Sequence, residues 1–163
     1  MSNMQLDNTR KDCRRYSIPE SNQVLELSSS VIQLFETYRQ TGRRSEAGGL
    51  LFAQFCLPSI IIKEATGPNK KDKRSRFSFI PFRNTQRKII SHRFKLGFHF
   101  VGEWHTHPEH NPSPSGLDLN SMHDSFVKSK HELNAFVMII VGSLESDLCL
   151  WVSLHNRTGF TQL

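Results

Sequence analysis

Two histidines, a serine and an aspartate in one short stretch have the types and spacing of a metal site. His105 and His107 are separated by a single residue, Ser115 lies eight residues after His107, and Asp118 three residues after Ser115. Alternate residues of a strand point to the same side, so the two imidazoles can converge on one ion. Two imidazoles and a carboxylate are a frequent ligand set for zinc and leave a fourth position open for water. The stretch therefore predicts a catalytic zinc site with one ion per chain.

The residues around this stretch indicate which elements position it. Phe98 to His105 has strand character, and prolines then interrupt any regular ladder from Pro108 to Pro114. A helix is expected from Ser115 to Ser129, with Ser115 as its N-cap and Asp118 in its first turn. The start of a helix favours a carboxylate and helps to keep it ionised. The histidines would thus come from a strand and the aspartate from the following helix.

A hydrolytic zinc site also needs a general base and a donor that stabilises developing negative charge. Ser115 is the nearest neutral donor in the stretch. The best candidate for the base is Glu46, which opens an apolar segment from Glu46 to Phe55. Burial in that segment would raise the pKa of the glutamate toward neutrality, where a general base works best.

The remaining sequence predicts an α/β or α+β sandwich around one sheet, because helical and strand-like patterns alternate. We expect residues 1 to 22 to form a disordered arm, because they are polar and carry no clear period. Further strands are expected at residues 24–27, 46–55, 59–65, 76–81, 133–142 and 148–154, and further helices at about 28–41 and 84–95. The second of these helices should bury Ile89, Ile90 and Phe94.

Composition excludes several classes of protein. The chain has 163 residues, of which 37% are hydrophobic and 22% charged, as in a soluble globular domain. Its apolar runs are too short to span a bilayer, and its polar N-terminus has no secretory signal pattern, so we expect a cytoplasmic protein without membrane contact. Three scattered cysteines argue against a disulfide framework and a thiolate metal site. Cys56 and Cys149 lie in apolar stretches, which favours a role in core packing.

The formal net charge of +6 is concentrated in two basic clusters, Arg10–Arg15 and Lys70–Arg76. Such clusters are most often a solvated tail and a solvated loop, although they can attract an acidic partner or nucleic acid. No stacking aromatic residues alternate with them, so we do not expect nucleic-acid binding.

Glu46, the His-Thr-His-Pro run at residues 105–108, Ser115 and Asp118 together resemble the JAMM motif of the JAB1/MPN/Mov34 metalloproteases. The resemblance covers about residues 24 to 154. It implies a single MPN domain over residues 23–163, an α/β fold with a mixed sheet flanked by helices and a topology like that of cytidine deaminases. It also implies that His105, His107 and Asp118 bind Zn²⁺.

The same resemblance implies catalytic roles and a substrate class. Glu46 would take a proton from the attacking water and pass it to the leaving amine, and Ser115 would donate to the oxyanion. The activity implied is cleavage of ubiquitin-like conjugates after the modifier's C-terminus. Gly48 and Gly49 suggest that the extended tail of the substrate passes close to the backbone there.

The short chain and the Gly-Glu-Trp run at residues 102–104 are similar to compact bacterial members of the family, encoded beside E1- and E2-like enzymes in CBASS antiphage operons. This narrower resemblance implies that the protein deconjugates a cGAS-like nucleotidyltransferase from its target, with an E1/E2-like enzyme as a possible partner. Glu103 departs from the aromatic residue that the pattern favours. Two alternatives stay open: a non-catalytic MPN scaffold, and a JAMM peptidase that processes another ubiquitin-like or small protein.

Overall fold

One curled eight-stranded sheet organises the protein, for which the computed structural model describes residues 13–163. The strand order is β1-β2-β4-β3-β7-β8-β9-β10, and β5 and β6 form a separate hairpin. The strands are β1 (Arg14–Ser17), β2 (Val24–Leu27), β3 (Gly48–Cys56), β4 (Ser59–Ala65), β5 (Lys73–Ser75), β6 (Ser78–Ile80), β7 (His99–Thr106), β8 (Phe136–Val141), β9 (Leu150–His155) and β10 (Phe160–Gln162). The helices of this part of the chain are α1 (Ser29–Tyr38), α2 (Arg83–Lys95) and α3 (Gly116–Lys128).

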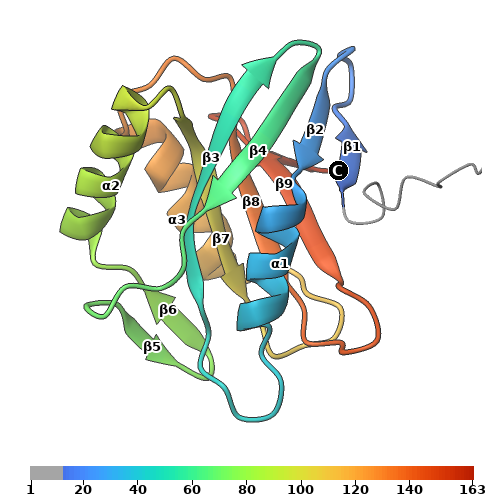
Figure 1. The fold of residues 1–163 in the computed structure, drawn as a ribbon, viewed down its shortest axis with the longest axis vertical. Helices are drawn as coiled ribbons and strands as arrows, with labels where there is room; N and C mark the ends of the chain where they lie inside the picture. The colour runs from blue at the N-terminus through green and yellow to red at the C-terminus, as the bar shows by residue number, and fades with distance from the viewer. Residues whose placement is uncertain (1–12) are drawn as a thin grey trace, which may run out of the picture.

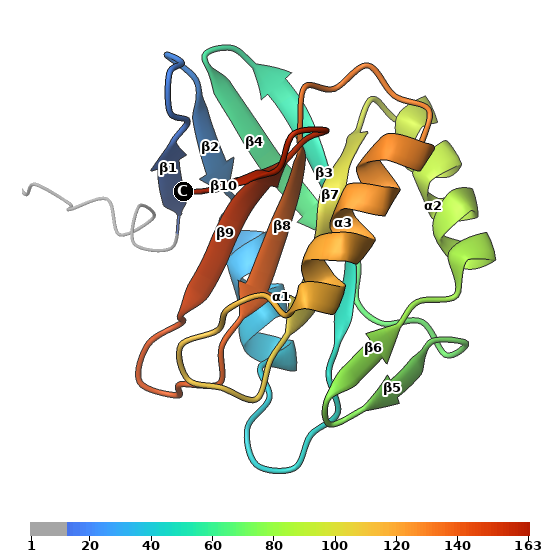
Figure 2. The ribbon, with the colours of Figure 1, turned by 180° about the vertical axis from the view of Figure 1, so that it is seen from behind.

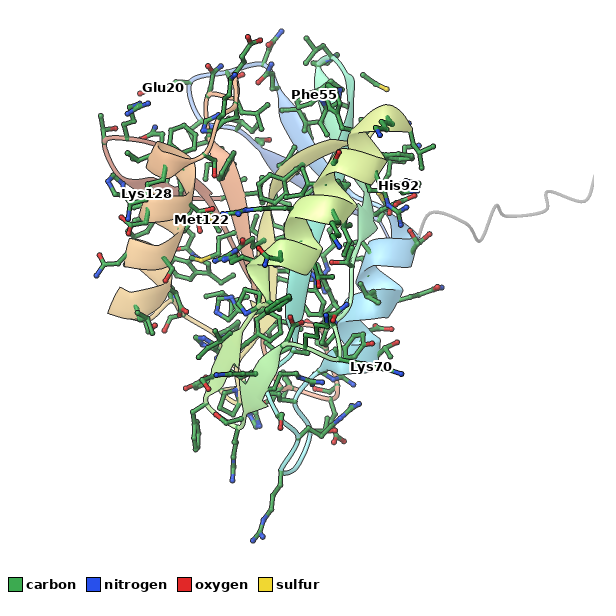
Figure 3. All side chains as sticks on the ribbon, turned by 90° about the vertical axis from the view of Figure 1, so that its left-hand side faces the viewer. Glu20, Phe55, Lys70, His92, Met122 and Lys128 are labelled. Carbon is green, nitrogen blue, oxygen red and sulfur yellow. The ribbon has the colours of Figure 1, made fainter. Side chains whose placement is uncertain are left out.

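Helices cover both faces of the sheet. Helix α1 lies on the face turned to the viewer in Figure 1, and α3 lies on the opposite face, with α2 beside it (Figure 2). Val31, Ile32 and Phe35 form the buried side of α1, as expected for apolar residues at helical spacing. Met122 and Phe126 do the same for α3, and Figure 3 shows Met122 on the side of α3 that faces the sheet. Two hydrophobic cores therefore form, one under each helical layer.

Strand β7 lies at the centre of the sheet and has two different faces. Trp104 points to the α1 side, where its ring centroid lies 4.9 Å from that of Phe35. Because successive side chains alternate, Glu103 and His105 point to the α2 and α3 side. The register fixes this arrangement: His105 lies opposite Gly48 of antiparallel β3 and opposite Ile140 of parallel β8.

The β5–β6 hairpin stands outside the main sheet, at the end where β3 begins and β7 stops (Figure 1). The Glu46 N–H donates to the Ser75 carbonyl at 2.8 Å, and the Arg74 Nε donates to the Glu46 carbonyl at 2.6 Å. The hairpin is therefore attached directly to the residue that the sequence proposes as the general base.

Most of the expected elements are confirmed, namely the mixed sheet, the flanking helices and the antiparallel pair β8–β9. The predicted arm over residues 1–22 is wrong for Arg14–Ser17, which form β1 and pair with β2; residues 1–12 lie outside the described part of the chain. The expected strand at 76–81 shortens to β6, and the preceding loop contains β5. These strands have only three or four residues each, too few to show a clear alternation of side chains, although β1 pairs with the nearby β2 and β5 with the adjacent β6.

Two predictions about burial are wrong. Phe94 is 65% exposed, although its ring centroid lies 5.8 Å from that of His99, whereas Ile89 and Ile90 are half-buried and Gln86 is the buried residue of that helix. Cys56 is exposed, because β3 runs out of the core at its C-terminal end, and Cys149 is half-buried. Figure 3 places the neighbouring Phe55 at the far end of the molecule, which explains the exposure of Cys56.

Candidate metal centre

His105 and His107 meet at the C-terminal end of β7. Their Nε2 atoms lie 3.1 Å apart, although only His105 belongs to the strand. The His107 N–H donates to the Val141 carbonyl at 2.9 Å, so the chain keeps an extended course for one residue past the strand. The prediction that both imidazoles point to one side is therefore confirmed.

Asp118 reaches the histidines from the first turn of α3, held by a capping box. The Ser115 Oγ accepts from the Asp118 N–H at 3.1 Å, and an Asp118 carboxylate oxygen accepts from the Ser115 N–H at 2.7 Å. This reciprocal pair satisfies two donors that a helix start otherwise leaves free. The same bonds fix the carboxylate, whose oxygens lie 3.4 Å from the His105 Nε2 and 3.3 Å from the His107 Nε2.

The three side chains fit a single metal ion. Ligands at the 2.0–2.1 Å typical of zinc, placed tetrahedrally, are roughly 3.3 Å from one another. The observed separations between the three ligand groups run from 3.1 to 3.4 Å. The two imidazoles and the carboxylate, each of whose oxygens lies near one histidine, are half-buried and converge as three candidate ligands of one ion.

The carboxylates around the site favour a positive charge between them. Burial alone would raise the pKa of Asp118, but hydrogen bonds from His105 and His107 outweigh it and hold that pKa well below its usual range. Burial would lower the pKa of His107, but its bond to Asp118 and the nearby carboxylates of Glu46 and Glu109 raise it instead. A metal cation can replace the proton that this anionic surrounding attracts.

Glu46 lies at the same end of the sheet. It precedes β3 by two residues and does not open the strand as the sequence suggested, yet its side chain is only 6% exposed. Burial raises the pKa of Glu46 from 4.5 to about 7. The charge of His107 has a smaller effect that lowers this pKa, and the charge of Asp118 has a smaller effect that raises it. These interactions place the carboxylate within electrostatic reach of the histidine and aspartate cluster.

The structure gives the two remaining predicted features different roles. Glu103 lies on the same face of β7 as His105 and forms an ion pair with Arg83 at the start of α2. The close approach at Gly48 and Gly49 comes from the protein itself: a Cβ on Gly48 would lie 2.7 Å from the Phe79 ring, and one on Gly49 would lie 1.9 Å from the Thr66 carbonyl. The prediction that substrate fills this space is wrong.

Sequence reasoning missed two buried polar residues near the site, Gln40 and Thr106. Gln40 is 2% exposed and Thr106 is fully buried. The only available signal was that a polar residue, Thr106, sits between two metal-ligand candidates on a central strand. Nothing in the sequence marks Gln40.

The fold and the site together define a class of protein: an α/β domain with a metal-compatible cluster of two histidines and an aspartate beside a buried glutamate. The chain belongs to the prokaryotic homologues of the JAB domain, whose family model matches residues 28–153. This membership confirms the resemblance to the JAMM family.

Curated relatives cover most of the chain and share one name, CD-NTase/cGAS isopeptidase. The relative from Pseudomonas aeruginosa is 31% identical over 129 residues, covering 77% of this chain and 82% of its own. The relative from Escherichia coli is 34% identical over 147 residues, with coverages of 84% and 85%. The relative from Vibrio cholerae is 26% identical over 152 residues, with coverages of 87% and 88%.

Two solved structures share the fold. A protein from Desulfitobacterium hafniense superposes with a TM-score of 0.64 at 17% identity, covering 84% of this chain and 88% of that one. A protein from Salinibacter ruber gives a TM-score of 0.52 at 16% identity, with coverages of 84% and 87%. At these identities the likeness shows the fold alone.

Proposed function

We propose that this protein is a zinc-dependent isopeptidase that removes a conjugated cGAS-like nucleotidyltransferase from its target in bacterial antiphage defence. The observation that carries the proposal is the meeting of Glu46 with His105, His107 and Asp118 at one end of β7. A non-catalytic scaffold has no use for a buried glutamate with a pKa near 7 beside three ligand groups.

In this proposal, His105, His107 and Asp118 hold the ion. When bound, zinc supplies Lewis acidity and lowers the pKa of a coordinated water to about 7. Glu46 accepts the proton of the attacking water and passes it to the leaving amine, a role that suits a carboxyl group with a pKa near 7. The Ser115 Oγ uses a lone pair toward the Asp118 N–H, which leaves its own proton for the developing oxyanion.

The substrate class rests on the names of the relatives. The curated relatives from Pseudomonas aeruginosa and Escherichia coli are named for CD-NTase/cGAS isopeptidase activity. We propose the same class of conjugate for this chain.

A partnership with an E1/E2-like enzyme and a cytoplasmic location stay predictions from the sequence. No helix within residues 13–163 combines the length and apolar character that crossing a membrane requires.

The test is turnover of a nucleotidyltransferase joined through its C-terminus to a lysine of a second protein. Release of the free nucleotidyltransferase, followed by gel and intact mass, should stop on chelation and return with zinc. Glu46→Gln should lower kcat by about 10²–10⁴-fold, the usual contribution of a general base. Glu36→Gln, at an exposed position of α1, is the matched control and should keep full turnover. Turnover that survives both chelation and Glu46→Gln would overturn the proposal.

A further inference from the structure

Thr106, the residue between the two metal-ligand histidines, is joined to the segment that carries Glu46. Its side chain points to the α1 face, opposite to that of His105, and is fully buried. The Thr106 Oγ1 accepts from the Ala47 N–H at 2.9 Å, and the Thr106 N–H donates to the Ala47 carbonyl at 2.8 Å. Both backbone polar groups of the residue after Glu46 are thus bonded to Thr106.

Gln40 extends this connection to two further segments. The Thr106 hydroxyl donates to the Gln40 Oε1 at 2.8 Å. The Gln40 Nε2 donates to the Arg44 carbonyl at 3.0 Å and to the Arg76 carbonyl at 2.9 Å. One buried amide therefore links the end of β7, the loop before Glu46 and the β5–β6 hairpin.

The hairpin holds Glu46 from its other side. Arg74 and Ser75 bind both polar groups of the Glu46 backbone, and Gln40 binds the next residue, Arg76. Glu46 belongs to neither a helix nor a strand, and residues in such loops are usually the more mobile ones. Its position relative to the metal ligands is therefore set by these hydrogen bonds and by the adjacent Ala47–Thr106 pair, which continues the register of β3 and β7.

We propose that Gln40 and Thr106 are positioning residues that hold Glu46 at the working distance from the metal ligands. Within residues 13–163 neither side chain is hydrogen-bonded to His105, His107 or Asp118. Thr106 binds Ala47, the residue after Glu46, so the effect of both residues reaches Glu46 through the backbone of Ala47. The inference rests on the proposed function, because it assigns a use to the position of Glu46. A displacement of about 1 Å in such a group can cost on the order of 10²-fold in rate.

Thr106→Val tests the inference, because it replaces the hydroxyl with a methyl group of the same shape. We expect kcat to fall by roughly 10- to 100-fold with KM unchanged, since substrate contacts are intact. Binding of Co²⁺, followed by its visible absorption, should match the parent protein, because the three ligands are untouched. Thr106→Ser retains the hydroxyl and should restore most of kcat.

Gln40→Leu should act in the same direction as Thr106→Val. Gln33→Leu is the matched control, because Gln33 lies on the exposed side of α1 and its side chain forms no hydrogen bond within residues 13–163. The Gln33→Leu variant should leave kcat unchanged. An unaltered Co²⁺ spectrum in Gln40→Leu shows that the protein is folded around the site. Loss of that spectrum together with kcat would assign Gln40 a purely structural role and overturn its part of the proposal.

A double variant separates positioning from general destabilisation. If Thr106 acts through Glu46, Thr106→Val should have almost no further effect on the residual turnover of Glu46→Gln. An equal loss in both backgrounds would overturn the inference. If Thr106→Val keeps full turnover while Glu46→Gln is inactive, the inference is overturned and the proposed function stands. If Glu46→Gln itself keeps full turnover, both the proposed function and the inference are overturned.

Discussion

The burial that suits Glu46 to its proposed role as a general base works against the stability of the folded protein. Its carboxyl group is almost fully buried, and burial raises its pKa to about 7. A carboxylate that is easier to ionise in the unfolded chain than in the folded one lowers stability wherever it is charged. The proton transfer proposed for Glu46 therefore comes at a cost in folding free energy, as is common for groups at functional sites.

This cost should appear as a pH-dependent gain in stability for Glu46→Gln. Between pH 4.5 and about 7 the folded wild-type protein binds more protons at Glu46 than the unfolded chain, so wild-type stability falls as pH rises through that window. In the metal-free protein at pH 8, Glu46→Gln should be more stable than wild type by about 1–3 kcal/mol, and the difference should shrink at pH 4.5. Urea unfolding with chelator at both pH values measures it.

Glu36→Gln, at an exposed position, is the control and should change stability by less than about 0.5 kcal/mol at either pH. A Glu46→Gln variant that is less stable than wild type at pH 8 would show that the charged carboxylate is stabilised in the folded state, contrary to the raised pKa.

At the scale of elements, the start of α3 combines two roles in one residue. Ser115 caps the helix with its Oγ lone pair and is the proposed oxyanion donor with its hydroxyl proton. The capping box also holds the carboxylate of Asp118 toward the histidines. Stability and catalysis at this helix start can therefore be separated only by substitutions that keep one role and remove the other.

Ser115→Asp keeps an N-cap acceptor and removes the donor, whereas Ser115→Ala removes both. We expect Ser115→Ala to lose about 1 kcal/mol of stability and Ser115→Asp to lose much less. Both should lower kcat by about 10²–10³-fold, the usual effect of losing an oxyanion donor. Unfolding curves and turnover assays on the two variants provide the comparison. Wild-type turnover in Ser115→Asp would contradict the donor role.

The elements that the sequence predicted well are those with strong local signals. The Ser-Gly-Leu-Asp start of α3 and the fully apolar run of β8 identify themselves through capping chemistry and burial. Strands β1, β5 and β10 have three or four residues each, which is too few to show a clear alternation of apolar and polar side chains, although their partners β2, β6 and β9 lie close in sequence. The metal ligands and Glu46 were found by residue type and spacing, but Gln40 acquires its role only from three segments that folding brings together.

At the scale of the whole molecule, the candidate site joins parts of the chain that are far apart in sequence. Its residues come from the loop before β3, the end of β7 and the start of α3. The three ligands lie within residues 105–118, but they come from the end of β7 and the first turn of α3, so they converge only when β7 and α3 are folded. Metal binding should therefore favour the folded state.

Zinc should raise the melting temperature of the metal-free protein. At a free concentration about 100 times the Kd, binding adds about 2.7 kcal/mol, which corresponds to roughly 5–10 °C for a domain of this size. His107→Ala should lose this shift, because it removes one of three ligands. His110→Ala, at an exposed neighbouring position, should keep it. Calorimetry with and without zinc tests this, and a full shift in His107→Ala would contradict the ligand assignment.

The register between β3 and β7 limits how the gene can change in length. Gly48 lies opposite His105, and the alternation along β7 separates the imidazole face from the Thr106 face. One codon inserted or deleted between Gly102 and His105 would move His105 and His107 together to the α1 face, where Phe35 and Gln40 lie, and turn Thr106 to the face that the imidazoles now occupy. Loops on the surface tolerate such events. Evolution of this central strand is therefore restricted to substitution, while changes of length are confined to the connecting loops.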